Sequence, residues 1–474
     1  MGVRISKSDM VWSYVALFFN MGSGLITLPV ILHMLSTEEI AMNYLMMTIG
    51  SMVAMVDFGF SPQFARNFTY VFSGATELKE EGVSENVQSG INYHLLRCLI
   101  DCAKTIFRYM SLIVLILMLT AGTWYISAIT DGFTNIENSL LIWIVYSLSV
   151  YLNIYFCYYS SLLTGRGMIK EAKKAGMFSR IVYILLTYSL LLAGFGLLGV
   201  CIANLISPFI SRWISYRCFY DAQIKEALSG EKSSGEEVRN LFHILWYNAK
   251  KLGITTVGTY AALKFSLFIS GLYLTMEDVS SFGLLMQLAN YIVMISTTFN
   301  STLIPELTSY KVNNNQDGLI KRFSWALNVF QVSFICLSAG LVLLGPALLH
   351  LIGSNADLPS RLIVVLYLLI LFLENNHSLF ATFITVGNSV PFAKVSIISG
   401  TLICIGDFLI LKYTGLGLLG LVLVQGIVQL AYNNWYWPYK VCKDLNLSYI
   451  TLSVIGQKES LEKVRDFKAK ILSA

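Results

Sequence analysis

The sequence predicts an all-α polytopic membrane protein of about 12 transmembrane helices, arranged as two pseudo-symmetric six-helix bundles. Three observations predict this fold class. The chain is 55% hydrophobic and only 13% charged, whereas soluble domains carry roughly 25% charged residues. Apolar runs recur at a length of about 20 residues, which as a helix crosses a hydrocarbon core of roughly 30 Å. The two halves of the chain also resemble each other.

Twelve apolar stretches are candidate spans. The first stretch follows Arg4 and Lys7 and has the flanks of a secretion signal, but it is too long and lacks a cleavage site between small residues, so we interpret it as a retained span. The predicted spans are 10–33, 39–62, 107–129, 138–162, 177–194, 197–217, 249–273, 279–304, 326–352, 360–386, 391–412 and 415–438.

The spans divide the chain into four parts. We expect an N-terminal six-helix bundle at 1–220, a cytoplasmic linker with an interfacial helix at 221–248, a C-terminal six-helix bundle at 249–440, and a cytoplasmic tail at 441–474. Apolar residues recur at helical spacing in 91–106 and in 241–246, which predicts two helices lying at the membrane interface. The tail repeats this pattern weakly and is expected to lie on the membrane or to be disordered.

The distribution of basic residues predicts the orientation. Most of the 33 Lys and Arg lie at the termini and in or beside alternate connectors, and only Arg361 and Lys412, at the ends of their spans, lie at the opposite face. By the positive-inside rule we expect both termini to be cytoplasmic, which requires an even number of spans. The expected location is the inner (plasma) membrane of the cell. The net charge of +5 therefore reflects topology, and no nucleic-acid partner is implied.

Two pairs of matching segments indicate an internal duplication. The glycine-rich stretch 193–200 (AGFGLLGV) matches 414–421 (TGLGLLGL), and 35–41 (LSTEEIA) matches 274–280 (LTMEDVS). Each member of the first pair permits a sharp turn, and each member of the second carries a Ser/Thr-x-x-acid capping box at a helix start. Coincidence is the alternative for either pair alone. An offset of six spans keeps the halves in the same orientation, which predicts a cavity between two bundles.

The opening of the chain resembles a known family. Residues 28–35, Glu38–Glu39, Tyr44–Leu45 and 57–60 (DFGF) with Arg66 are similar to polysaccharide-biosynthesis flippases such as the O-antigen repeat-unit translocases, in the superfamily of multidrug, oligosaccharidyl-lipid and polysaccharide exporters. Ile304–Leu307 (IPEL) is also typical of that superfamily.

The resemblance implies a V-shaped cavity that opens alternately to each side and admits an undecaprenyl-pyrophosphate-linked oligosaccharide, an O-antigen or capsule repeat unit. It further implies membrane lipid, a polysaccharide polymerase and chain-length proteins as partners. A cation-coupled multidrug exporter of the same superfamily is the alternative. A glycan polymerase or ligase is a third class, and it is disfavoured because no extracytoplasmic connector exceeds about ten residues. We therefore expect a transporter and not an enzyme.

Basic residues within or beside the spans are candidate substrate-binding residues, because a charge at the bilayer centre costs roughly 2.5–3.5 kcal/mol and normally faces a cavity or a partner. Lys264 lies near the middle of its span, where a cation could attract a pyrophosphate, and the alternative is a structural ion pair. Arg212 is within snorkelling reach of the headgroups. Arg66 follows the second span, and topogenic charge explains it almost as well. Among the aromatic residues, Tyr151, Tyr155, Tyr158 and Tyr159 of the fourth span could stack on sugars, and the alternative is the interface belt and packing that explain most aromatic residues.

Acidic residues in spans are candidates for ion coupling. Glu374 and His377 stand three residues apart on one helix face, a spacing that suits a proton or Na⁺ site or a simple hydrogen-bonded pair. Asp407 and Asp57 are weaker candidates for the same role.

Other chemistry is not indicated. The chain has no G-x-x-x-x-G-K-[ST] loop, so the sequence does not indicate ATP-driven pumping, and we expect an H⁺ or Na⁺ gradient to drive any uphill transport. No cofactor is expected. The eight cysteines contain no C-x-x-C pair, and the Cys98/Cys102 pair at i, i+4 is surrounded by no cluster of ligands in the sequence, so no metal site is expected.

Overall fold

The computed structural model describes residues 26–57, 59–80, 90–312, 315–385 and 392–472, together with Trp12, Phe19, Gly22 and Gly24. Within these residues every regular element is a helix, and the chain divides into two compact units, Met1–Tyr260 and Ala261–Ala474. The long helix α11 (Gly235–Tyr273) contributes to both units.

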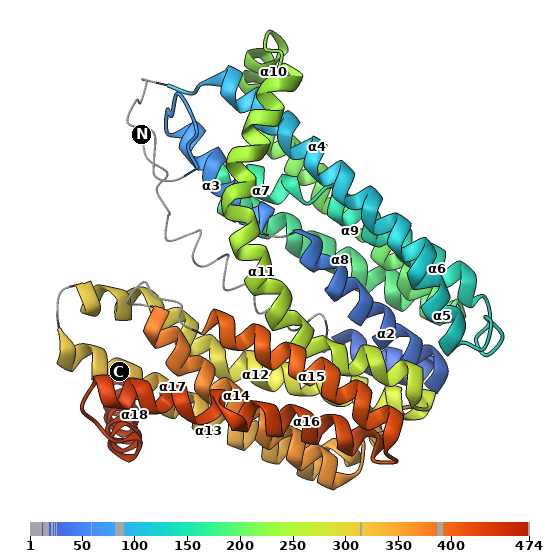
Figure 1. Ribbon diagram of the computed structural model, residues 1–474, viewed down its shortest axis with the longest axis vertical. Helices are drawn as coiled ribbons and strands as arrows, with labels where there is room; N and C mark the ends of the chain where they lie inside the picture. The colour runs from blue at the N-terminus through green and yellow to red at the C-terminus, as the bar shows by residue number, and fades with distance from the viewer. Residues whose placement is uncertain are drawn as a thin grey trace. The chain divides into compact units, whose positions relative to one another are not determined.

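Unit 1 is built from paired helices. In Figure 1, α8 and α9 run side by side, α6 packs on α9, and the short α3 packs on α7. Its helices are α2 (Thr37–Val53) with the 3₁₀ turn η1 (Ala54–Asp57), α3 (Phe60–Phe72), α4 (Tyr93–Leu117), the π-helical turn η2 (Met118–Gly122), α5 (Thr123–Ile129), α6 (Ser139–Tyr155), α7 (Tyr158–Gly165), α8 (Ile169–Leu192), α9 (Gly196–Phe219) and α10 (Ala222–Ser229).

Unit 2 follows the same plan. Helix α12 packs on α13, α15 on α16, α14 on α17, and the C-terminal α18 on α13 (Figure 1). Its helices after α11 are α12 (Met276–Val312), α13 (Gln316–Leu351), α14 (Arg361–Thr385), α15 (Ala393–Tyr413), α16 (Gly417–Ala431), α17 (Asn433–Asp444) and α18 (Tyr449–Leu472).

Side-chain burial shows that the helices are adapted to lipid. On α6 the serines Ser147 and Ser149 are buried, while Leu140, Ile144 and Leu148 are each more than 40% exposed. A large exposed apolar surface is unfavourable in water. These outward-facing leucine and isoleucine side chains therefore indicate contact with lipid acyl chains. The protein is therefore a multi-pass membrane protein, and the fold class predicted from the sequence is confirmed.

Eight helices within the described residues are long and apolar enough to cross a membrane. Four predicted spans are not among them, for local reasons. Half of 10–33 lies outside the described residues, as do most side chains of 249–273. The stretches 39–62 and 415–438 are each divided by a break, at Gly59 and at Tyr432. The eight are Tyr93–Ile129, Ser139–Gly165, Ile169–Leu192, Gly196–Phe219, Met276–Asn300, Gln316–Leu351, Arg361–Ile384 and Lys394–Tyr413.

The duplicated segments adopt the same local structures in the two units. Helices α9 and α16 both begin after a glycine-rich turn, and the matching Gly196 and Gly417 have φ of 52° and 53°. Such left-handed values favour glycine, which explains why the turn repeats in sequence. Both predicted capping boxes form: the Glu39 N–H donates to Ser36 Oγ at 3.2 Å, and the Asp278 N–H donates to Thr275 Oγ1 at 3.2 Å.

Three segments differ from the sequence-based expectations. The stretches 91–106 and 241–246 are not separate interfacial helices but early turns of the longer helices Tyr93–Ile129 and Gly235–Tyr273. The tail is neither disordered nor free, because α18 packs along α13 and the Ser460 hydroxyl donates to Asn328 Oδ1 at 2.7 Å. Hydropathy could not predict this packing, since it depends on the surface of another helix, α13.

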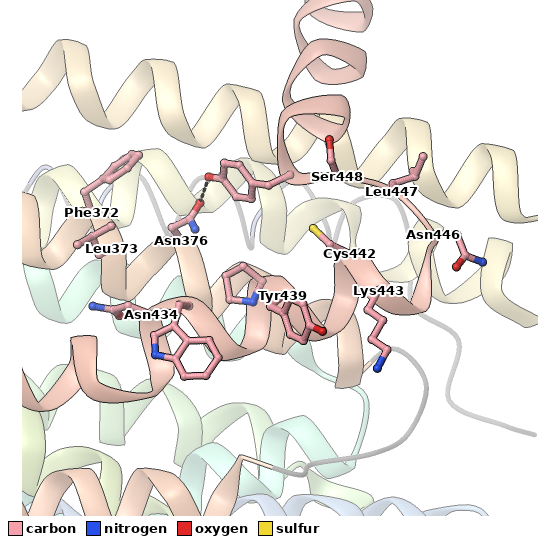
Figure 2. A pocket seen from close by; sticks show the side chains of 13 residues that line it. Phe372, Leu373, Asn376, Asn434, Tyr439, Cys442, Lys443, Asn446, Leu447 and Ser448 are labelled. Carbon is pink, nitrogen blue, oxygen red and sulfur yellow. Dashed lines mark hydrogen bonds between the residues drawn. The ribbon is translucent and has the colours of Figure 1, made fainter.

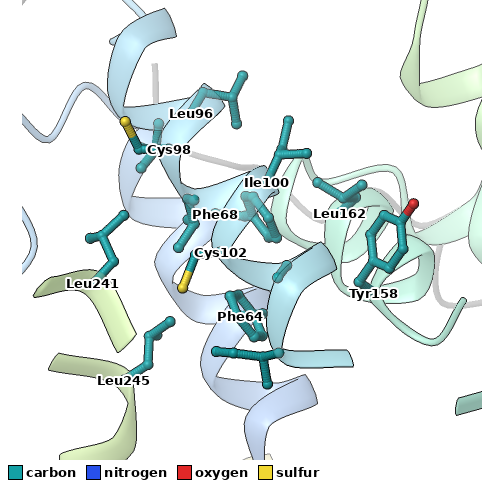
Figure 3. Close-up of a cluster of buried hydrophobic side chains, with 14 of the residues drawn as sticks. Phe64, Phe68, Leu96, Cys98, Ile100, Cys102, Tyr158, Leu162, Leu241 and Leu245 are labelled. Carbon is teal, nitrogen blue, oxygen red and sulfur yellow. The ribbon is translucent and has the colours of Figure 1, made fainter. Parts of the chain in front are cut away.

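An apolar cluster unites six helices of unit 1. Figure 3 shows Phe64 and Phe68 of α3 packed with Cys98 and Cys102 of α4, near Leu241 of α11. Residues of α7, α9 and α10 complete the cluster. These contacts fix the beginning of α11 against the beginning of α4, which positions the polar groups described below.

Candidate functional site

Two helices of unit 1 are interrupted at points that contact each other. Between η1 and α3, Gly59 adopts φ 75°, and the Asp57 carboxylate accepts hydrogen bonds from the Ser61 N–H at 3.1 Å and its hydroxyl at 2.9 Å. Between α6 and α7, the break falls at Phe156 and Cys157. The Cys157 thiol lies 3.3 Å from the Ser61 hydroxyl, so the two breaks meet. Asp57 thus caps the start of α3.

Arg212 of α9 lies against the break between α6 and α7. Its Nη2 donates to Asn153 Oδ1 at 3.0 Å, and the guanidinium lies 4.6 Å from the ring centre of Phe156 and 4.8 Å from that of Phe209. Its Nη1 is buried and has no hydrogen-bond acceptor among the described residues. An unpaired buried donor is costly, so this guanidinium has spare capacity for an anionic or hydroxylic ligand.

Arg66 occupies a different position. It is exposed on α3 and its Nη2 donates to Gln63 Oε1 of the same helix. In the described part of the chain no hydrogen bond joins Arg66 to Arg212. Lys264 lies on α11, but its side chain is outside the described residues.

A cationic pocket in unit 1 was not predicted. Four helices enclose a cavity of about 330 Å³, with Tyr158 and Tyr159 from α7 and Tyr216 from α9, and with Tyr220 just beyond α9. The remaining lining residues are Arg97, Ile100 and Lys104 of α4 and Lys225, Leu228 and Ser229 of α10. We call this the tyrosine pocket. No single motif signals it, because its cations lie on separate helices.

The charge of the tyrosine pocket is only partly compensated. Asp101 accepts from Arg97 Nε at 2.7 Å and lies 3.9 Å from Lys104 Nζ, whereas Lys225 Nζ lies 5.5 Å from the ring centre of Tyr216. Three cations thus face one carboxylate. Flat tyrosine rings beside N–H donors are suited to sugars and phosphate oxygens, which take stacking and charge-assisted hydrogen bonds respectively.

Arg166 positions α10 over this pocket. Its guanidinium donates to Phe219 O at 2.8 Å and to Asp221 Oδ2 at 2.6 Å. Asp221 also caps α10 by accepting from the Ile224 N–H at 2.9 Å. This N–H bond and the Arg166 guanidinium lower the pKa of the Asp221 carboxyl below its ordinary value. The turn from α9 into α10 is therefore fixed, and Lys225 follows one turn later.

In unit 2 the candidate coupling residues Glu374 and His377 have different partners. The buried Glu374 carboxylate accepts from Gln425 Nε2 of α16 at 2.9 Å, while His377 Nδ1 lies 2.8 Å from Asn434 Oδ1 of α17. Because a carbonyl oxygen only accepts, this contact places the proton of His377 on Nδ1. The two residues are therefore not bonded to each other.

The break at Tyr432 supplies polar groups that bind to α15 and to the helices on either side of the break. Asn433 donates to Ser399 Oγ and to Gln429 Oε1, both at 2.9 Å, and it accepts from Trp437 Nε1 at 3.0 Å. Interrupted helices in membranes expose polar groups where ligands bind. The predicted single span 415–438 did not anticipate this break, since Tyr432 carries no Gly or Pro signal.

A larger pocket of about 820 Å³ lies between α14 and α17. Figure 2 shows Asn376 hydrogen-bonded to a tyrosine ring across this pocket, and the bond is from the Tyr449 hydroxyl to Asn376 Oδ1 at 2.9 Å. Asn434 and Lys443 line the same pocket. The pocket is thus next to the His377–Asn434 pair.

Asp407 lies apart from this network. It is fully buried on α15, and its Oδ2 accepts from the Ser266 hydroxyl of α11 at 2.6 Å. Its Oδ1 has no hydrogen-bond donor among the described residues. The four predicted coupling residues therefore occupy three separate places: Asp57 in unit 1, Glu374 with His377 in unit 2, and Asp407 beside α11.

The whole chain resembles solved membrane transporters. It matches the lipid II flippase MurJ in an inward closed conformation with a TM-score of 0.64 and 14% identity, covering 96% of this chain and 91% of that one. It matches an inward-facing multidrug-resistance MATE transporter of the MOP superfamily with a TM-score of 0.63 and 13% identity, covering 91% and 95%. A MATE transporter of Vibrio cholerae gives a TM-score of 0.54 at 12% identity, covering 92% and 97%.

By sequence, no family model and no curated protein matches the chain. The structural matches define the class: the protein has the two-lobed helical fold found in MurJ and in MATE transporters. Because all three identities are below 15%, the likeness establishes the fold and leaves the substrate to be argued from the residues.

Proposed function

We propose that this protein is a flippase that moves an undecaprenyl-pyrophosphate-linked oligosaccharide, an O-antigen or capsule repeat unit, from the cytoplasmic to the outer leaflet of the inner membrane by alternating access. The observation that carries the proposal is the tyrosine pocket, which offers three cations and four tyrosines inside a fold shared with a lipid II flippase. A multidrug cation would be repelled by such a lining, whereas pyrophosphate and sugar would be retained.

The basic residues have distinct proposed roles. Arg212 binds the pyrophosphate or a sugar oxygen by donating a hydrogen bond from its unpaired Nη1, since this donor is buried at the break between α6 and α7. Lys264, near the middle of its predicted span, is a further proposed contact for an anionic group, and Arg66 contributes charge where the substrate enters. In this proposal the tyrosine pocket lies at the cytoplasmic end of unit 1, where the substrate is made available, as the positive-inside rule predicts for a region rich in basic residues.

Coupling is assigned to unit 2. Glu374 is buried with one neutral donor, Gln425, and no cation hydrogen-bonds or forms an ion pair with it among the described residues. A carboxylate in such a place is stable when it binds H⁺ or Na⁺, so its occupancy can follow the membrane gradient. His377 and Asp407 are further proposed sites for the coupling ion, and Asp57 acts mainly as the cap of α3.

The test measures cell-surface polysaccharide in a deletion strain. The wild-type gene restores it, and Lys225→Ala, Arg212→Ala and Lys264→Ala restore less than a tenth of the wild-type level, because each removes a charge-assisted contact worth about 1.5–3 kcal/mol. Lys232→Ala is the matched control, since Lys232 lies in the connector after α10 and does not line the pocket. Unaltered polysaccharide in the deletion strain contradicts the proposal.

A cation-coupled multidrug exporter is the second candidate function. It is favoured by the buried acidic and amide network of unit 2 and by the likeness to MATE transporters. Drug sensitivity of the deletion strain with normal polysaccharide would select it. The variant Glu374→Gln separates substrate binding from ion coupling, because it keeps the side-chain shape and the Gln425 contact while removing the charge. It is expected to abolish gradient-dependent transport and leave substrate binding unchanged under either function.

A further inference from the structure

Three potential metal ligands converge where α4 and α11 begin. His94 Nε2 lies 2.8 Å from Glu237 Oε1, and the Cys98 thiol lies 3.7 Å from His94 Nε2 and 3.8 Å from Glu237 Oε2. His94 and Cys98 are one helical turn apart on α4, whereas Glu237 is in the first turn of α11. All three lie in unit 1.

The spacing of these atoms suits a zinc ion. With Zn–N and Zn–O near 2.1 Å and Zn–S near 2.3 Å, the edges of a tetrahedral site are about 3.4 Å for N···O and about 3.6 Å for N···S and S···O. The N···S edge, from His94 Nε2 to Cys98 Sγ at 3.7 Å, matches within about 0.1 Å, and one ligand atom from each of the three residues lies within 4.8 Å of the others. The N···O edge is shorter because a hydrogen bond now occupies it, and the insertion of a metal requires an opening of about 0.6 Å.

The neighbouring residues support the ligands in the orientation that a metal requires. His94 Nδ1 lies 3.1 Å from Glu231 Oε2, so this carboxylate accepts the Nδ1 proton and leaves Nε2 as the ligand atom. The Ser234 N–H donates to Glu237 Oε2 at 2.8 Å and holds the second carboxylate.

We propose that His94, Cys98 and Glu237 bind a zinc ion that ties the beginning of α4 to the beginning of α11, with water as the fourth ligand. Cys98 is 2% exposed and supplies an inner ligand, while the His94 and Glu237 side chains are 46% and 43% exposed and leave the ion a path from solvent. Binding releases the proton held between His94 and Glu237 and the thiol proton of Cys98. The ion stabilises the packing of α11 on α4, and α4 also lines the tyrosine pocket with Arg97, Ile100 and Lys104.

The test uses the full-length protein in detergent, purified without a histidine tag and stripped with a chelator. After incubation with Zn²⁺ and desalting, elemental analysis should find about one zinc per chain. The same protein loaded with Co²⁺ should show the near-ultraviolet absorption of a cobalt–thiolate bond. Both signals should be lost in Cys98→Ser and His94→Ala.

Two matched controls separate the site from its surroundings. Cys102→Ser removes a thiol one turn further along α4 in the same apolar cluster and should retain zinc and the cobalt spectrum. Glu231→Gln should weaken zinc binding about 10–100-fold, as removal of a partner of a ligating histidine generally does, whereas Glu226→Gln should not. Absence of the cobalt–thiolate band in the wild-type protein overturns the proposal without reliance on any variant, and so does zinc retention by Cys98→Ser together with His94→Ala.

Discussion

The packing of α18 on α13 depends on a single glycine, and substitution of this glycine tests the packing in unit 2. Gly456 is buried, and a Cβ atom there would lie well inside van der Waals contact of Ser324 O and 2.9 Å from Asn328 Cβ. Ser324 O belongs to the backbone of α13 and cannot rotate away. Gly456→Ala must therefore move the two helices apart.

The expected cost follows from these contacts. Overpacking at a rigid site costs about 1–3 kcal/mol, and a displacement that breaks the Ser460–Asn328 hydrogen bond adds about 1 kcal/mol. For a unit of this size, each kcal/mol lowers the melting temperature by about 2–4 °C. Gly456→Ala should therefore lower the apparent melting temperature in detergent by about 4–16 °C.

A second glycine provides the control. Gly340→Ala lies within α13, where a Cβ atom meets nothing within 4 Å, so the better helix propensity of alanine should leave the melting temperature unchanged or slightly raised. If the Gly456→Ala and Gly340→Ala variants have the same melting temperature, α18 is not packed on α13 and the prediction is refuted.

Two further predictions concern unit 1. Gly165→Ala should destabilise the contact of α7 with α3 by about 1–3 kcal/mol, because its Cβ atom would clash with Phe68 Cβ and lie 2.9 Å from Ala65 O. The loss is measured as the difference in melting temperature from Gly176→Ala, whose added Cβ atom meets nothing within 4 Å. Asp221→Asn should lower the melting temperature modestly at neutral pH, since asparagine still caps α10 but loses the charge that pairs with Arg166. The folded-state pKa of Asp221 is below its ordinary value of 3.8, so this stabilisation is present above that pH and is lost as the pH falls through the folded pKa; a constant difference between wild type and variant from pH 7 to pH 3 would refute the assignment.

The sequence predicted those features that depend on local pattern. Hydropathy identified the membrane class, and the repeated capping boxes and glycine turns were found where the duplication placed them, because caps and left-handed glycines are properties of a few adjacent residues. Breaks in the spans were missed at Phe156 and Tyr432, since neither position carries a Gly or Pro and both breaks are stabilised by contacts with other helices.

The candidate site shows the same division. Glu374, His377 and Arg212 could be selected from sequence because a polar group in an apolar run is conspicuous. Their partners Gln425, Asn434 and Phe156 could not.

By itself, the sequence determined that this chain crosses the membrane many times, that its halves resemble each other, and which polar residues stand within apolar segments, because each follows from the local content of a short segment. Only the tertiary structure decided that three cations and four tyrosines share one pocket, that Glu374 and His377 have separate partners, and that Glu237 meets His94 and Cys98. Such groupings join residues more than 50 positions apart, whose proximity is set by helix packing and not by any property of their own segments.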